Sequence, residues 1–294
     1  MQGNKTTVFT ISQEQKQYST YLLTDTTANT QIEVVPERGG IITHWRKAEQ
    51  EILYLDEARY ADPTKTIRGG VPILFPICGN LPDDTYSYQG NEYKLPQHGF
   101  ARNLPWDVIA TSTDDCASIT LSLKSDESTL AVYPFACEIV FTYQLRGNSL
   151  TILQAYTNNS DSDMPFSAGF HPYFTVGEKQ QLELDIPETK YFSNVTKTMM
   201  DFSGSFDFDL DEIDAAFVPM RKNSSSFSDR DRKITLEYPD FFSTIVFWTV
   251  KGKDFICLEP WSAPRNAINT GEKLIYIKPG TTYNSTLTMN CETI

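Results

Sequence analysis

Residues Cys137 to Asn158, CEIVFTYQLR-GN-SLTILQAYTN, carry the clearest strand pattern of the chain. Apolar and polar residues alternate on both sides of Gly147-Asn148, and a period of two is the pattern of a strand with one buried face. A Gly-Asn pair between two such runs predicts a tight β-hairpin. We therefore expect this region to form the clearest hairpin of an antiparallel sheet.

Runs of the same kind recur along the rest of the chain, separated by turn residues. Aromatic residues make up 13% of the sequence and often alternate with Thr and Ser, which favours strands. Strands are expected at 8–12, 18–24, 31–35, 41–45, 51–55, 106–111, 117–124, 181–186, 234–238, 243–250 and 255–258, with further hairpins at 86–93 and 273–289. The less regular segment 125–135 has room for a short helix. The sequence predicts one all-β domain over residues 1–294, since chains of roughly this length can form a single large core.

The composition excludes several classes of partner. Acidic residues outnumber basic ones by 38 to 25, for a net charge of −13, which argues against binding to nucleic acid. No segment has the roughly 18 apolar residues of a membrane span, and the first residues lack an apolar signal segment. The five cysteines are an odd number without a CxxC pair, so reduced, buried thiols are favoured over disulfides or zinc ligands. These features predict a cytoplasmic protein with a small-molecule ligand.

One of only three histidines lies in an aromatic run, Phe166-Ser-Ala-Gly-Phe-His-Pro-Tyr-Phe174. Pro172 restricts the backbone of His171, and Gly169 leaves room for another chain or a ligand to approach. An imidazole held among aromatic rings suits a proton donor to a bound substrate. The other interpretation is a buried structural histidine bonded to a backbone carbonyl, and the run itself does not decide between them.

Two further stretches point to a polar binding site. Residues 68–80, RGGVPILFPICGN, contain two prolines and three glycines, which predicts a loop packed into a fixed shape with Arg68 as its only charge. Residues 95–102, LPQHGFAR, place His98 beside glycine and phenylalanine, with Arg102 four residues on. His44, next to Trp45, is interpreted as a structural or surface histidine.

A carboxylate follows the expected buried strand 255–258. There Pro260 should end the ladder and Trp261 should cover Glu259, whose partial desolvation would make it a stronger base. A glutamate paired with an arginine at a strand edge is the alternative.

The acidic run 201–214, DFSGSFDFDLDEID, lacks the pattern of a calcium loop. Most of its carboxylates should be solvated, but Asp214 is bracketed by apolar residues. Residues 221–233 are expected to form a mobile polar turn.

Taken together, five of these pieces resemble the aldose 1-epimerase (mutarotase) family. They are PERGGIITHW from Pro36, RGGVPILFPICGNL from Arg68, LPQHGFAR from Leu95, FHPYF from Phe170 and CLEPW from Cys257. The resemblance implies a large antiparallel β-sandwich of the galactose mutarotase type, with a few short helices and no metal or cofactor in catalysis. It implies His171 as general acid and Glu259 as general base. It also implies Arg68, His98 and Asp214 as residues that hold the sugar, with Arg102 close by.

The resemblance leaves the substrate open. One branch of the family acts on free hexoses and another on hexose 6-phosphates, which arginines would bind. The CLEPW ending and the segment from Gly79 to Arg102 resemble the free-hexose branch, and the acidic net charge also disfavours a phosphate dianion. A non-catalytic sugar-binding protein is a further possibility, but it would have no reason to combine His171 with Glu259.

Overall fold

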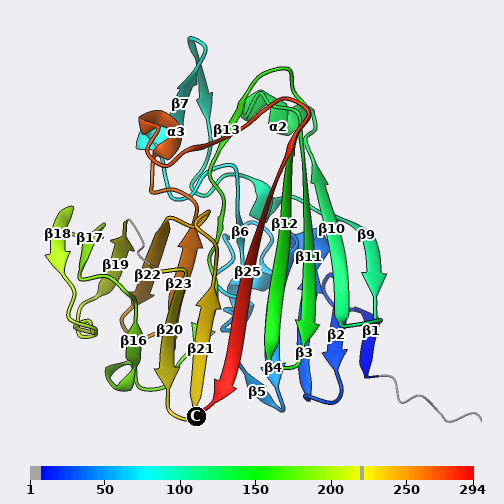
Figure 1. The fold of residues 1–294 in the computed structure, drawn as a ribbon, viewed down its shortest axis with the longest axis vertical. Helices are drawn as coiled ribbons and strands as arrows, with labels where there is room; N and C mark the ends of the chain where they lie inside the picture. The colour runs from blue at the N-terminus through cyan, green and yellow to red at the C-terminus, as the bar shows by residue number, and fades with distance from the viewer. Residues whose placement is uncertain (1–7, 219–221) are drawn as a thin grey trace, which may run out of the picture.

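The computed structural model describes residues 8–218 and 222–294, and its strands form antiparallel sheets (Figure 1). The predicted all-β class with few short helices is confirmed. A cluster of buried residues joins the large sheets, for example where Phe141 meets Phe170 with ring centroids 5.7 Å apart. The three α-helices of the described residues are α1 (Glu57–Ala61), α2 (Glu127–Val132) and α3 (Ala267–Thr270). Short 3-10 turns lie at Pro36–Arg38, Pro82–Asp84, Ala101–Asn103 and Lys179–Gln181.

The first large sheet contains the hairpin from which the fold was predicted. Its order is β16 (Glu183–Asp185), β20 (Ser224–Asp229), β21 (Arg232–Glu237), β25 (Thr282–Thr293), β12 (Ser149–Asn158), β11 (Cys137–Arg146), β10 (Ala117–Lys124) and β9 (Asp107–Ser112). In Figure 1, β25, β12 and β11 run side by side across the molecule. The pairing of β11 with β12 runs without a break from Arg146↔Ser149 to Cys137↔Asn158, which confirms the predicted hairpin and its turn.

The second large sheet carries the segments that the sequence singled out as functional. Its order is β18 (Thr198–Asp201), β17 (Lys190–Ser193), β19 (Glu212–Phe217), β22 (Thr244–Val250), β23 (Phe255–Trp261), β14 (Gly169–Phe170) and β6 (Ile73–Leu74), with β15 (Tyr173–Thr175) also paired to β23. Both β14 and β15 therefore use β23 as their partner, one after the other.

The remaining strands form one meander and two small ribbons. The five-stranded N-terminal sheet contains β1 (Phe9–Gln15), β2 (Ser19–Asp25), β3 (Thr30–Val35), β4 (Ile41–Lys47) and β5 (Gln50–Glu51). The ribbons are β7 (Thr85–Tyr88) with β8 (Asn91–Lys94), and β13 (Met164–Phe166) with β24 (Ile275–Ile277). The β7–β8 pair is the hairpin predicted at 86–93.

Three local expectations were wrong. Pro260 does not end the ladder, because β23 continues to Trp261 and pairs with β22 at Ile245↔Pro260. The segment 273–289 is not a hairpin: β24 pairs with β13, whereas β25 pairs with β12 and β21. Residues 224–233 are not a mobile turn but parts of β20 and β21, in which Ser225, Ser226 and Phe227 are buried. Arg221, where that expected turn began, lies outside the described residues.

The loop from Arg68 to Asn80 is packed into a fixed shape, as its prolines and glycines predicted. It lies along the segment from Ser167 to Tyr173, whose backbone amides donate to the loop: Ser167 to Pro76 O, His171 to Pro72 O and Tyr173 to Gly70 O. The loop thus supports the backbone around His171 from the side opposite β23. Among the helices of the described residues, none is long and apolar enough to cross a lipid bilayer.

Candidate active site

The register of β23 places His171 opposite Glu259. Gly169 of β14 pairs with Trp261, and Tyr173 of β15 pairs with Cys257. His171 lies midway between the two paired residues, as Glu259 does on β23. The ladder is interrupted at His171-Pro172 because proline lacks an amide hydrogen and the amide of His171 donates to Pro72 instead. The imidazole and the carboxylate therefore face each other across a short break in an otherwise antiparallel pairing.

The neighbouring strands β22 and β19 place further side chains on the same face of the sheet as Glu259. Trp248 of β22 pairs with Cys257 on one side and with Asp214 of β19 on the other. Directly opposed residues of an antiparallel sheet share a face, and Cys257 shares its face with Glu259, two residues further along β23. The side chains of Trp248 and Asp214 therefore lie on the same side of the sheet as Glu259. The close approach of β14 requires Gly169, where a Cβ atom would lie 2.7 Å from the carbonyl oxygen of Pro260.

These side chains line a cavity of about 340 Å³. All six residues that the sequence analysis proposed for the site border it: Arg68, His98, Arg102, His171, Asp214 and Glu259. The segments that hold them are far apart in the chain, and the fold brings them together. Trp261, which was expected to cover Glu259, also lines the cavity, and residues that the sequence analysis did not assign to the site complete the lining: Arg59, Thr66, Ile67, Gln97, Tyr173, Glu212, Val246, Trp248 and Arg265.

His171 and Glu259 form the most buried ionisable pair of the cavity. His171 Nε2 lies 3.3 Å from Glu259 Oε1, and the two side chains are 11% and 1% exposed. Trp261 Nε1 donates to Glu259 Oε2 at 3.1 Å, and the ring of Tyr173 stacks on the imidazole at 4.7 Å with planes 11° apart. Among the residues that the structure describes, no lysine or arginine lies within ion-pair distance of Glu259.

Burial acts in opposite directions on the two members of this pair. It raises the pKa of Glu259 well above its ordinary value, and the nearby Asp214 carboxylate adds to the rise. Burial and then the Arg102 charge lower the pKa of His171 to about 3. Burial therefore opposes two changes: the binding of a second proton by the pair, and the loss of the one proton that it holds. The pair is therefore stable with one shared proton over a wide pH range.

His98 is held in one orientation by the loop of residues 68–80. The amide of Gly79 donates to His98 Nδ1 at 3.0 Å, and the amide of His98 donates to the Gly79 carbonyl at 2.7 Å. Because Nδ1 accepts a hydrogen bond, the proton of the neutral ring is on Nε2. Burial, and then the charge of Arg102, lower the pKa of His98 well below its ordinary value. His98 therefore remains a neutral donor.

Three arginines of the cavity have no carboxylate partner among the described residues: Arg59, whose Nε donates to the Thr66 carbonyl, and the two proposed from the sequence, Arg68 and Arg102. Arg68 is exposed and its guanidinium lies 5.5 Å from the centre of the Trp248 ring. Arg102 is half-buried and donates from Nη2 to the carbonyl of Gln97 at 2.7 Å. Burial lowers the pKa of Arg102. Both groups thus keep donors available for a ligand.

Asp214 is held by a partner that the sequence analysis missed. Arg265 Nη2 lies 2.8 Å from Asp214 Oδ2, and Asn194 Nδ2 lies 2.8 Å from Asp214 Oδ1. Arg265 also packs over the Trp261 ring at 5.4 Å and fits over Gly79, where a Cβ would lie 2.4 Å from Arg265 Cγ. Its position four residues after Trp261 was the one feature of the sequence that could have placed Arg265 near the site. Trp248, in an expected strand, carried none.

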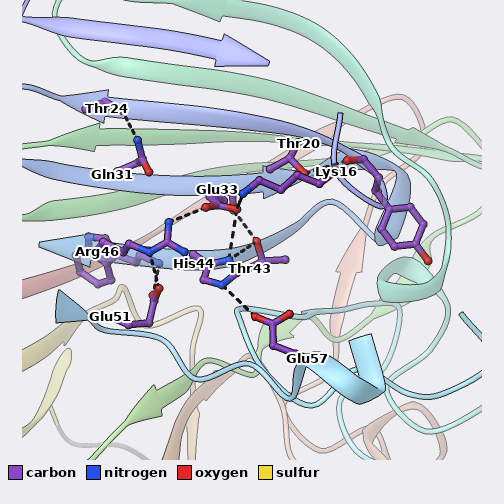
Figure 2. A network of polar contacts seen from close by, with 12 residues as sticks. Lys16, Thr20, Thr24, Gln31, Glu33, Thr43, His44, Arg46, Glu51 and Glu57 are labelled. Atoms are coloured by element: carbon purple, nitrogen blue, oxygen red, sulfur yellow. Dashed lines mark hydrogen bonds and ion pairs between the residues drawn. The ribbon is translucent and has the colours of Figure 1, made fainter. Parts of the chain in front are cut away.

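The third histidine, His44, lies in a different polar cluster (Figure 2). It stands opposite Glu33 in the β3–β4 pairing, with Nδ1 3.5 Å from Glu33 Oε2 and Nε2 3.5 Å from Glu57 Oε1. Lys16 and Arg46 each lie 2.6 Å from an oxygen of Glu33. This half-buried position agrees with the structural interpretation of His44.

Comparison with known proteins gives a consistent result over nearly the whole chain. The family model described as Aldose 1-epimerase matches residues 20–290. The crystal structure of Slr1438 from Synechocystis sp. PCC 6803 is 43% identical, covers 97% of this chain and 99% of its own, and superimposes with a TM-score of 0.93. A galactose mutarotase-like protein from Lactobacillus casei, 21% identical, covers 96% and 100% with a TM-score of 0.76 and shares the fold. The protein named "Putative glucose-6-phosphate 1-epimerase" from Cenchrus ciliaris is 25% identical over 268 residues, 82% of this chain and 76% of its own.

Proposed function

The chain belongs to the aldose 1-epimerase family of carbohydrate isomerases, and we propose that it interconverts the α and β anomers of a hexose through His171 and Glu259. The observation that carries the proposal is the buried His171–Glu259 pair, 3.3 Å apart, at the side of a cavity large enough for a pyranose ring. Positioned acid–base groups of this kind each contribute roughly 10²–10⁴-fold to a rate.

The reaction needs two proton transfers on neighbouring oxygens of the sugar. Glu259 as carboxylate takes the proton of the anomeric hydroxyl, while His171 as imidazolium protonates the ring oxygen. The bond between C1 and the ring oxygen breaks, and the C1–O1 bond becomes the carbonyl of the open aldehyde. Rotation about C1–C2 and reversal of both transfers close the ring as the other anomer.

The charge state of the pair supports this cycle. In the reacting form, Glu259 is a carboxylate and His171 is an imidazolium. In the resting form that burial favours, the same proton is on Glu259 and His171 is neutral. One proton moving across the 3.3 Å contact converts one into the other. A sugar hydroxyl that donates to the carboxylate favours the reacting form. The remaining groups suit sugar recognition, since the Trp248 and Trp261 rings offer flat faces and His98 offers a neutral donor.

A second candidate is the same reaction on a hexose 6-phosphate. The net charge of −13 favours a neutral sugar. However, screening limits surface charges to a range of about 8–10 Å, whereas Arg68 and Arg102 line the cavity itself. A phosphate bound by a guanidinium gains charge-assisted hydrogen bonds, and the name of the Cenchrus ciliaris relative agrees with such a substrate. The local charges therefore make the phosphorylated hexose a specific competitor to the free one.

Polarimetry tests the proposed reaction. Freshly dissolved α-D-glucose or α-D-glucose 6-phosphate is followed to equilibrium rotation with and without the protein. We expect faster equilibration with at least one of the two sugars, and the ratio of kcat/KM assigns the substrate. Binding of both sugars without any acceleration would instead indicate a non-catalytic sugar-binding protein.

A further inference from the structure

Cys257 lies beside the His171–Glu259 pair, and the proposed reaction does not use it. A nitrogen of His171, the sulfur of Cys257 and a carboxylate oxygen of Glu259 all lie within 4.8 Å of one another, and the three residues are buried. The register explains this convergence. Cys257 shares the face of Glu259 on β23, and its partner Tyr173 stacks on the imidazole of His171.

We propose that His171, Cys257 and Glu259 form a zinc-binding site at the side of the cavity, whose occupation blocks the enzyme. Nitrogen, sulfur and oxygen are the three kinds of protein ligand that zinc takes, and catalytic-type zinc sites use three protein ligands with a fourth position open. Two bonds of about 2.0 Å at a tetrahedral angle separate their ligand atoms by about 3.3 Å. The observed distance from His171 Nε2 to Glu259 Oε1 is 3.3 Å.

The charges of the three ligands match a divalent cation. A thiolate and a carboxylate together neutralise Zn²⁺, and a neutral imidazole completes the set without adding charge. Burial keeps the imidazole of His171 neutral at pH 7 and raises the pKa of the Cys257 thiol well above its ordinary value. Zinc must therefore displace protons from Cys257 and Glu259. Its affinity should rise with pH.

The site and the proposed reaction exclude each other, and this statement rests on the proposed function. With zinc bound, the lone pairs that His171 and Glu259 need for proton transfer are engaged by the metal. His171 and Glu259 both line the cavity in which the sugar is proposed to lie, so a metal held between them would stand at its wall. Zinc should therefore inhibit in competition with the sugar, and removing it should restore activity.

Cobalt spectroscopy tests the site without using catalysis. Co²⁺ is added to the full-length protein under reducing conditions, and a thiolate-to-cobalt charge-transfer band is monitored, followed by displacement with Zn²⁺. We expect one Zn²⁺ per chain at this site. Cys257→Ser should lose the band and bind Zn²⁺ at least about tenfold more weakly, whereas Cys137→Ser, which changes a thiol buried in β11, should retain both. No band in the wild type, or an equal band in Cys257→Ser, would overturn the site.

A second variant covers the case in which Cys257→Ser does not fold. Glu259→Gln keeps the side-chain volume and removes one charged ligand, so it should bind Zn²⁺ more weakly and its Zn²⁺ affinity should rise less with pH. An unchanged affinity and pH dependence would refute the proposed ligand set. Inhibition assays then separate the two proposals. A cobalt band in a protein that accelerates no sugar supports the zinc site and rejects the proposed function, while activity without a band does the reverse.

Discussion

Among the described residues, two buried glutamates each contact a histidine at nearly the same separation, 3.3 Å for His171–Glu259 and 3.5 Å for His44–Glu33. In both pairs, the partners stand opposite each other on antiparallel segments, and both glutamates are buried. Their surroundings differ. Glu33 contacts Lys16 and Arg46 at 2.6 Å each (Figure 2), whereas no described lysine or arginine lies within ion-pair distance of Glu259.

This difference reverses the electrostatics of the two carboxylates. Burial raises the pKa of Glu33, but the hydrogen bonds from Lys16 and Arg46 outweigh it and hold the pKa below its ordinary value. Nothing comparable offsets the burial of Glu259, whose pKa is raised. A neutralised carboxylate stabilises structure, and an uncompensated one is available for proton transfer. Cationic partners, more than the His–Glu contact itself, therefore distinguish the structural pair from the pair that we propose to react.

The largest expected difference between the pairs is in catalysis. His171→Asn and Glu259→Gln keep much of the hydrogen bonding but remove proton transfer, so each should lower kcat by at least about 10²-fold with a modest change in KM. The matched change His44→Asn should leave kcat within a few-fold of wild type. Polarimetric kcat and KM values measure all three. If His44→Asn proved as damaging as His171→Asn, the distinction between the pairs would fail.

The next effect concerns arginines with and without an acidic partner. If the substrate is a hexose 6-phosphate, Arg102→Ala should cost about 10- to 100-fold in kcat/KM for it, because a hydrogen bond to a charged group is worth roughly 1.5–3 kcal/mol. Glucose should be affected little. Arg46→Ala, which removes a partner of Glu33, should leave kcat/KM unchanged for both sugars. Equal losses for both sugars in Arg102→Ala would favour the free hexose.

The shared proton predicts the pH dependence of activity. Activity should fall where the pair gains a second proton or loses its only one. Because burial lowers the pKa of His171 to about 3 and raises that of Glu259, the bell should be broad, with a plateau across neutral pH. Rates are measured across the range in which circular dichroism shows a folded protein. A narrow optimum within one or two pH units would contradict the assignment.

Stability should respond oppositely to removal of the two carboxylates. Glu33→Gln leaves Lys16 and Arg46 without their charged partner and should cost about 1–3 kcal/mol, with a melting temperature lower by a few degrees. Glu259→Gln removes a carboxyl whose ionisation burial opposes, so it should leave stability unchanged or higher at pH 7. Denaturant unfolding at pH 7 compares the two variants with wild type. A loss in Glu259→Gln as large as that in Glu33→Gln would show that Glu259 is also structural.

The smallest effect is in the slope of stability against pH. The lowered pKa of Glu33 gives a contribution that is present above the unfolded-state pKa and is lost as the pH falls through the folded-state value. The raised pKa of Glu259 gives a contribution that is present below the unfolded-state pKa and is lost as the pH rises through the folded-state value. Relative to wild type, Glu259→Gln should therefore gain stability with rising pH and Glu33→Gln should lose it. Each slope is at most about 1.4 kcal/mol per pH unit. Unfolding curves measure the Glu33→Gln slope below pH 4.5 and the Glu259→Gln slope from pH 4.5 upward, and slopes of the same sign would refute the comparison.

Local patterns in the sequence predicted most of the fold. The alternation in 137–158 predicted the pairing of β11 with β12, and the irregular segment 125–135 contains α2, whose N-cap residue is Asp126. The failures were non-local. Within the expected strand 273–278, residues 275–277 pair with the distant β13 and not with the following strand. No turn signal reports such a partner.

The same contrast between local and non-local signals applies to the candidate site. His171, His98 and Glu259 stood out because they are rare or isolated residue types among prolines, glycines and aromatic rings. Arg265 did not, since its importance comes from contacts with Asp214 and Asn80 in other segments. Glu33 and Glu259 could not be distinguished electrostatically either, because the cations around Glu33 come partly from Lys16, 17 positions away along the chain.

The interrupted ladder at His171 builds this part of the site from two short segments that are held together by their pairing. The relative position of His171 and Glu259 is fixed on one flank by Gly169↔Trp261 and on the other by Tyr173↔Cys257. Nothing in that geometry depends on the number of residues between the two segments. Insertions and deletions in the exposed turns of the intervening region, 176–254, can therefore accumulate during evolution without altering the distance between His171 and Glu259. A single-residue insertion inside either five-residue segment, 169–173 or 257–261, would shift one flank against the other and destroy it.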